Sequence, residues 1–245
     1  MLTIRRTTAL LALSVILHSC GNAQTSDKAP TNVSEKSNSY DAWKKEAETE
    51  IRLNPRYGDA VKSEQQKAAD EQLINSFDTQ EGGRRKGAEN MIKVGFDYLS
   101  KGDLRTAMYR FNQAWLLDST NLNVYSGFAG IYHRFKDYKK SIKILDEGLS
   151  RDPKASGLMA DQATSYIAMF ASGHALNDRE KALSLFKASY AIDPRNQLTV
   201  YKLSRFYFML KNCEMAVKYY KECLNLGGQS ITQDYKDALK STCGL

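Results

Sequence analysis

The chain has 245 residues, of which 42% are hydrophobic and 26% are charged, and its formal net charge at pH 7 is +7. This composition is that of an ordinary folded protein and excludes a chain that is disordered throughout. Lysine and arginine are interspersed with glutamate and aspartate, and the one dense basic run, Arg84-Arg85-Lys86, lies in a glycine-containing linker. We therefore expect a mixed, solvated surface and no nucleic-acid partner.

The amino terminus has the pattern of a targeting segment. Arg5 and Arg6 precede a nearly unbroken apolar stretch from Ala9 to Leu17. This stretch is too short to span a bilayer as a stable helix and has the proportions of a secretory signal. It ends in the tetrapeptide LHSC at residues 17–20.

That tetrapeptide resembles the lipobox of bacterial lipoproteins, with a branched aliphatic residue three positions before the cysteine and a small residue directly before it. His18 departs from the usual small or aliphatic residue. The resemblance implies a signal peptide at residues 1–19, cleavage before Cys20, and fatty acyl chains such as palmitate on Cys20. Each buried methylene contributes about 0.8 kcal/mol, so several chains hold a protein firmly on a membrane. The alternative is an ordinary cleaved signal followed by an incidental cysteine.

The residues after Cys20 agree with an anchored protein. Residues 20–40 are rich in Ser, Asn, Thr, Gln and Lys, which cannot form a core, so we expect a flexible, lipid-anchored linker. Gly21 stands where an aspartate would retain many such lipoproteins at the inner membrane. Glycine at this position resembles the pattern of lipoproteins that are sorted to the outer membrane, so we expect an outer-membrane location in the bacterial cell envelope.

Residues 41–80 are predicted to form an N-terminal helical extension. Its first helix carries Trp43, Ala47 and Ile51 on one stripe and stops before Pro55, and its second helix runs over about 59–77. We expect this pair to pack onto the repeats that follow and to fill part of their groove.

Four tyrosines, Tyr98, Tyr132, Tyr166 and Tyr207, follow one another at intervals of 34, 34 and 41 residues. Small and large residues recur around each of them, in the pattern of the tetratricopeptide repeat family, whose unit is 34 residues long. This resemblance implies an all-α fold, an α-solenoid of about four repeats within residues 87–230.

The expected repeats are 88–121, 122–155, 156–196 and 197–230, and the third contains seven extra residues. We place this insertion around residues 171–178 and interpret it either as tolerated padding or as part of a binding site. A polar capping helix is expected in 231–245, where it covers the last apolar face.

The resemblance also implies a concave groove that binds a protein or peptide partner through the first helix of each repeat. The candidate groove residues are Asn123, Ser126, His133, Arg134, Tyr201, Arg205 and Phe208, together with Phe96, Leu99, Thr164, Ile167 and Met209. Their mixture of aromatic, apolar and arginine side chains suits an extended peptide or a partner helix. The alternative for Phe96 and Leu99 is packing against the N-terminal extension.

Three cysteines lie in the last part of the chain. Cys213 opens the second helix of the last repeat and Cys243 ends the expected capping helix, so an antiparallel arrangement of these two helices brings them together. A secretory signal implies an oxidising compartment, and we expect a Cys213–Cys243 disulfide. Cys223 falls at a small, buried position of the repeat and is expected to be a packed thiol.

We find no catalytic pattern in the sequence. After removal of the signal only His133 and His174 remain among the histidines, without neighbours at metal-ligand spacing. HExxH, GxSxG, phosphate-loop and dinucleotide-binding patterns are absent. We therefore expect no enzyme activity, no metal and no cofactor.

The leading hypothesis is a non-catalytic, membrane-anchored adaptor or assembly factor of the bacterial envelope. The alternative is a lipoprotein that captures a glycan or peptide substrate for an outer-membrane transporter.

Overall fold

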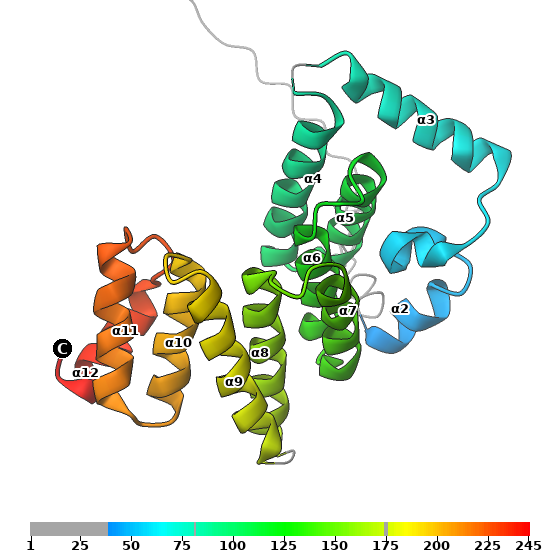
Figure 1. Cartoon of the computed structure of the whole chain (residues 1–245). Helices are drawn as coiled ribbons and strands as arrows, with labels where there is room; N and C mark the ends of the chain where they lie inside the picture. The colour runs from blue at the N-terminus through cyan, green and yellow to red at the C-terminus, as the bar shows by residue number, and fades with distance from the viewer. Residues whose placement is uncertain (1–38, 81, 174–175) are drawn as a thin grey trace, which may run out of the picture.

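The structure, a computed structural model, describes residues 39–80, 82–173 and 176–245. The expected signal peptide, Cys20, most of the linker and His174 lie outside these residues. All regular elements of the described part are helical, and Figure 1 shows the helices from α4 onward stacked as antiparallel pairs. The predicted all-α solenoid is confirmed.

Four helix pairs correspond to the four expected repeats. Their bounds are α4 Gly83–Ser100 with α5 Leu104–Leu117, α6 Asn123–Arg134 with α7 Tyr138–Arg151, α8 Ser156–Ala171 with α9 Asn177–Ile192, and α10 Gln197–Met209 with α11 Cys213–Asn225. A further helix, α12 Gln233–Cys243, follows α11 and packs against it.

The recurring tyrosine marks the end of the first helix in a pair. In three repeats its carbonyl oxygen accepts a hydrogen bond from the backbone N–H of the residue that caps the second helix. The N···O distances are 3.0 Å for Asp103 to Tyr98, 2.9 Å for Asp137 to Tyr132 and 2.9 Å for Asn212 to Tyr207. This bond belongs to a Schellman turn, so the tyrosine period is also the period of one turn geometry.

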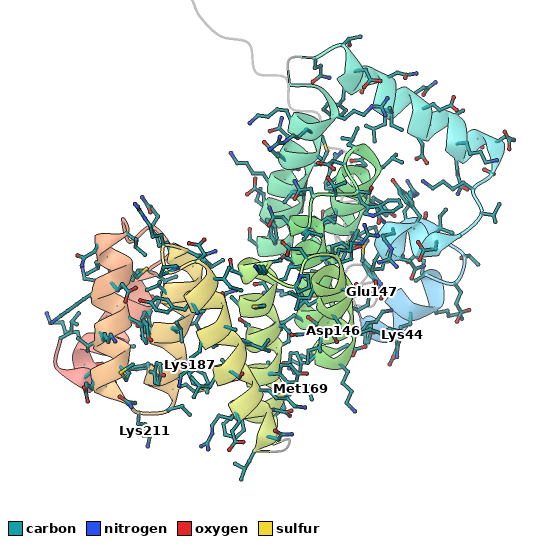
Figure 2. The ribbon with its side chains drawn as sticks, in the orientation of Figure 1. Lys44, Asp146, Glu147, Met169, Lys187 and Lys211 are labelled. Carbon is teal, nitrogen blue, oxygen red and sulfur yellow. A yellow bond between two sulfur atoms is a disulfide. The ribbon has the colours of Figure 1, made fainter. Side chains whose placement is uncertain are left out.

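The Schellman turn needs a left-handed residue just before the cap. Gly102 fills this place in the first turn, with φ of 81°, whereas Lys136 and Lys211 fill it in two others, with φ of 63° and 57°. Figure 2 labels Lys211 at the turn between α10 and α11. Two of the three turns therefore carry backbone strain that glycine relieves.

The third repeat absorbs its extra residues partly as helix. α8 and α9 have 16 residues each, compared with 12 and 14 in α6 and α7. α8 runs on to Ala171 and α9 starts at Asn177, so both ends of the stretch read as an insertion belong to these two helices.

Close helix crossings explain the small residues of the pattern. The ring of Phe111 is fully buried between α4 and α6, where a Cβ on Gly95 or on Gly127 would lie 2.5 Å or 2.4 Å from it. A side chain at either glycine would displace the ring, so these positions set the distance between neighbouring repeats.

The core consists of two apolar clusters that meet at α8. The first runs from Trp43 through Phe111 to Leu158 at the start of α8. The second begins at Ala160 and runs to Leu239 in α12. This arrangement is typical of a solenoid, in which each unit packs on its neighbours only.

The N-terminal extension is broken into shorter elements than predicted: α2 Tyr40–Glu46, the 3₁₀ turns η1 Ile51–Leu53 and η2 Pro55–Asp59, and α3 Glu64–Asp78. The predicted helix through Ile51 is wrong, because α2 ends at Glu46 and the Glu50 side chain caps a separate turn by accepting from the N–H of Arg52. The second helix starts later than 59, because Ser63 and Gln66 form a capping box at its first residue.

The extension packs on α5 and α7 of the first two repeats, and its helix α3 also contacts α4, where Phe77 lies against Gly87. Tyr40 Oη donates to Asp137 Oδ2 at 2.6 Å, and Arg56 Nη1 donates to Glu147 Oε2 of α7 at 2.6 Å. Figure 2 shows Glu147 on the same side of α7 as Lys44 of α2. The expectation that the extension fills part of the groove is wrong, because none of its described residues lines the two cavities on the face of the first helices.

A left-handed turn at residues 56–59 was not predicted. Arg56, Tyr57 and Asp59 have φ of 54°, 60° and 53° although none is glycine. The fully buried Asn112 of α5 holds this turn: its Oδ1 accepts from the N–H of Tyr57, and its Nδ2 donates to the carbonyls of residues 52 and 54. A network of this kind stabilises a backbone that is otherwise unfavourable.

Candidate functional site: a groove along the first helices

Two cavities lie on the face formed by the first helices. The larger, called here the C-terminal pocket, has a volume of about 660 Å³ and is lined by side chains of α8, α10 and α12 and by Phe186 of α9. The smaller, the central pocket, has a volume of about 180 Å³ and is lined mainly by α6 and α8, with two side chains of α7 and Phe96 of α4. Thr164 lines both, so the two pockets adjoin and form one groove.

Aromatic and aliphatic side chains dominate the C-terminal pocket. Phe206 and Tyr235 are buried beneath it, and Phe208 meets the Tyr235 ring edge-on, with centroids 5.6 Å apart. Met209 is 39% exposed at its mouth and Ile167 is half-buried. Such a concave apolar surface gains free energy when a large side chain covers it.

The rim of the C-terminal pocket is charged. Arg205 is exposed, and its guanidinium carbon lies 5.8 Å from the centre of the Tyr201 ring, a cation–π distance. Lys202 forms an ion pair with Asp161 of α8, which also accepts a hydrogen bond from the Ser126 hydroxyl. Among the described residues, none of the ion pairs involves Arg205.

The central pocket combines apolar walls with a cluster of hydrogen-bonded polar side chains. His133 Nδ1 lies 3.3 Å from Ser165 Oγ, which is 3.0 Å from Ser141 Oγ. Burial lowers the pKa of His133, and the nearby Lys202 ammonium lowers it further. His133 is therefore neutral at physiological pH and acts as a hydrogen-bonding group rather than a cation.

The groove brings some of the predicted residues together and leaves out others. Ser126 and His133 line the central pocket, and Arg205 and Phe208 line the C-terminal pocket. Asn123 and Arg134 are exposed at opposite ends of α6, and neither lines a pocket.

The structure corrects the assignment of Tyr201 to the groove surface. It is only 6% exposed, because α12 covers it: its ring meets Tyr235 edge-on at 5.5 Å, and its hydroxyl lies 3.3 Å from Thr232 Oγ1. The side chain belongs to the core beneath the cap rather than to the surface that a partner would contact. Its one role toward the groove is to support the Arg205 guanidinium.

Two of the predicted residues had competing interpretations. Phe96 is 38% exposed, lines the central pocket and meets the Phe111 ring at 5.2 Å. Leu99 is half-buried and packs next to Gly130 of α6. Both therefore pack against the first two repeats rather than against the extension.

Sequence reasoning missed several groove residues. Asp161 and Lys202 lie one position away from those that the family pattern assigns to ligand contact. Asp234 and Tyr235 lie in α12, outside the repeats, yet both line the C-terminal pocket. The aromatic residue in an otherwise polar capping helix was the one signal that pointed to them.

The structure joins Cys213 to Cys243 in a disulfide, the pair that the sequence analysis expects. This bond ties the end of α12 to the start of α11. Cys223 is a free, buried thiol, and burial raises its pKa.

Within the described residues, no group of three or more His, Cys, Asp or Glu side chains is placed to hold a metal ion. The groove chemistry is therefore that of apolar contacts, hydrogen bonds and one unpaired guanidinium. Paired helices, a repeated turn and a groove on the first helices together define a helical-repeat protein of the protein-binding kind.

The comparison with protein families names the repeat. The chain matches the tetratricopeptide repeat family over residues 98–161. It is also similar to anaphase-promoting complex subunit 3 of Schizosaccharomyces pombe, with 26% identity over 148 residues, which are 60% of this chain and 21% of that protein. The chain thus spans about a fifth of that relative's length.

A solved structure has the same fold. TTC0263, a thermophilic TPR protein of Thermus thermophilus, superposes with a TM-score of 0.54 at 18% identity, over 63% of this chain and 80% of that one. PilF of Pseudomonas aeruginosa superposes with a TM-score of 0.47 at 15% identity, over 64% of this chain and 70% of that one.

Proposed function

We propose that this protein is a non-catalytic adaptor or assembly factor, anchored in the bacterial cell envelope by lipid on Cys20, that binds a segment of a protein partner in its groove. The observation that carries the proposal is the C-terminal pocket, whose lining leaves Phe208 and Met209 accessible from outside. An accessible aromatic and apolar concavity with an arginine at its rim is typical of a protein-binding hot spot.

The position of the N-terminal extension supports this use of the groove. None of the described residues of the extension lines either pocket, so within the part of the chain that the structure describes both pockets stay open. A partner therefore does not need to displace part of the folded chain before it binds.

The anchor rests on the sequence at residues 1–20 alone. In the described part of the chain, none of the helices combines the length and the apolar content needed to cross a bilayer. Acyl chains on Cys20, followed by a linker up to residue 40, would hold the repeats near the outer membrane and leave the groove open to envelope proteins.

Photocrosslinking in intact cells tests the groove. A photoreactive amino acid is placed at Arg205 or Met209, and at Lys143 of α7 as a control on an exposed position outside the groove. We expect one discrete crosslinked protein from the two groove positions and none from the control. Equal yields from all three positions would refute binding in the groove.

Labelling with a palmitate analogue tests the anchor independently. The wild-type chain is expected to incorporate label and to fractionate with membranes, and the Cys20→Ala variant to do neither. Membrane association that persists without label would show that something other than acylation holds the protein there.

A further inference from the structure

We propose that the partner segment is an extended, acidic stretch of protein that places a large apolar side chain in the C-terminal pocket and a small side chain in the central pocket, with one carboxylate facing Arg205 and another facing Arg134. This inference rests on the proposed function and specifies the chemistry of its partner.

The two pockets differ in size and lining. A cavity of about 150 Å³ accommodates benzene when its walls are apolar. The central pocket has about that size, 180 Å³, and Phe96, Ala129 and Leu145 line it beside polar side chains that already bond one another, so it suits a small side chain. The C-terminal pocket, at 660 Å³ and with four aromatic rings in its lining, has room for a large apolar side chain and its neighbours.

The distance between the pockets favours an extended chain. They share Thr164, so side chains that enter them belong to nearby residues of the partner. In an extended segment, residues two apart point to the same side and lie about 7 Å from each other. One strand-like stretch can therefore fill both pockets with alternate residues.

Two exposed arginines of the first helices, one at the rim of the C-terminal pocket and one at the end of α6 beside the groove, form no ion pair among the described residues. Lys202 and Asp161 neutralise each other, and Asp234 lies in the first turn of α12, where the helix dipole favours a negative charge. Arg205 and Arg134 are both exposed, and no ion pair among the described residues includes either. Carboxylates of the partner are the groups that complement these guanidinium groups.

Helix packing gives the spacing of the two carboxylates. α6 packs on α8, and α8 packs on α10, and packed helices lie about 8–10 Å apart, so α6 and α10 are separated by about 16–20 Å. An extended chain covers this distance in about five or six residues. The partner segment should therefore carry acidic residues at roughly that separation, one on each side of its pocket-filling residues.

Selection from a phage-displayed library of random 12-residue peptides on the full-length protein tests the inference. We expect the enriched peptides to combine Asp or Glu with a large apolar residue. A synthetic copy of the best peptide with its acidic residues changed to amides should bind at least about tenfold more weakly, and rising salt should weaken the original peptide.

A charge exchange identifies the arginine involved. The Arg205→Glu variant should bind the acidic peptide about tenfold or more weakly than the wild type does. It should bind more tightly to a peptide in which one glutamate is replaced by lysine. Lys143→Glu, the same charge change outside the groove, should leave the affinity unchanged.

The outcomes separate the inference from the proposed function. One outcome is that the selected peptides bind the Met209→Asp variant more weakly and yet keep their affinity when their own carboxylates are removed. That result would refute an acidic partner and support binding in the groove. If the library is not enriched, or if Met209→Asp weakens none of the selected peptides, then the groove itself and with it the proposed function are refuted.

Discussion

Replacement of Cys213 and Cys243 by serine should destabilise the C-terminal end of the solenoid by about 3.5 kcal/mol. The disulfide links residues separated by 30 positions, and the chain-entropy relation assigns a stabilisation of about 3.5 kcal/mol to a loop of that size. Without the bond, α12 keeps its place chiefly through the burial of Tyr235 and Leu239. A terminal repeat has a neighbour on one side only, so the loss should appear first as local opening of α12.

Amide hydrogen exchange measures this opening directly. A change of 3.5 kcal/mol corresponds to exchange about 300-fold faster for the protected amides of α12. Exchange in α6 and α7, which belong to the other apolar cluster, serves as the internal control and should hardly change. A reductant should speed α12 exchange in the wild type and not in the double variant.

The consequence for the groove follows from the same contacts. Tyr235 lines the C-terminal pocket, so the double variant should also bind any groove ligand more weakly. An increase in α12 exchange of less than about threefold would refute the argument, because it would show that apolar packing alone fixes the cap.

Three further predictions concern the repeats. Lys136→Gly should stabilise the protein by about 0.5–1 kcal/mol in urea unfolding, because it relieves a left-handed residue with φ of 63°; a loss of stability would contradict the strain assigned to that turn. Gly127→Ala should cost about 1 kcal/mol, because its Cβ would lie 2.4 Å from a buried phenyl ring and the clash outweighs the better helix propensity. Gly157→Ala, where nothing lies within 4 Å, is its matched control and should not destabilise. Finally, the lowered pKa of His133 means that the unfolded chain binds this proton more tightly, so stability should fall as the pH drops below about 6.5. His133→Gln should reduce that slope of unfolding free energy against pH, and an unchanged slope would assign the effect to other groups.

The solenoid was predictable because the sequence features that determine it lie within each repeat. Each repeat keeps its own tyrosine and its own small residues at the crossing, and three of the four keep a capping Asp or Asn. These features determine a turn such as that at Tyr132 and Asp137 within a few residues. Contacts between repeats then follow from stacking the same unit again. Ser126, His133, Arg205 and Phe208 were placed in the groove by the same register.

The predictions failed where contacts from a distant segment of the chain determine the local structure. Tyr201 has a groove position in the repeat register, but α12 returns over it and buries it. The left-handed turn before Ala60 depends on Asn112, which lies more than 50 residues further along the chain and donates or accepts three hydrogen bonds to it. No local pattern in the sequence signals such a turn, since three of its four residues have side chains that disfavour it.

The polar contacts at α8 connect the architecture to the binding site. Ser165 contacts His133 and Ser141, and Gln162 Nε2 donates to Asp146 Oδ1 of α7, at the point where one apolar cluster gives way to the other. Hydrogen bonds of this kind contribute about 0.5–1.5 kcal/mol each, less than the burial of a large apolar side chain. Thr164 of the same helix lines both pockets. A segment seated in both would therefore span the junction between the two clusters and contact both of them, so that binding couples the two halves of the solenoid.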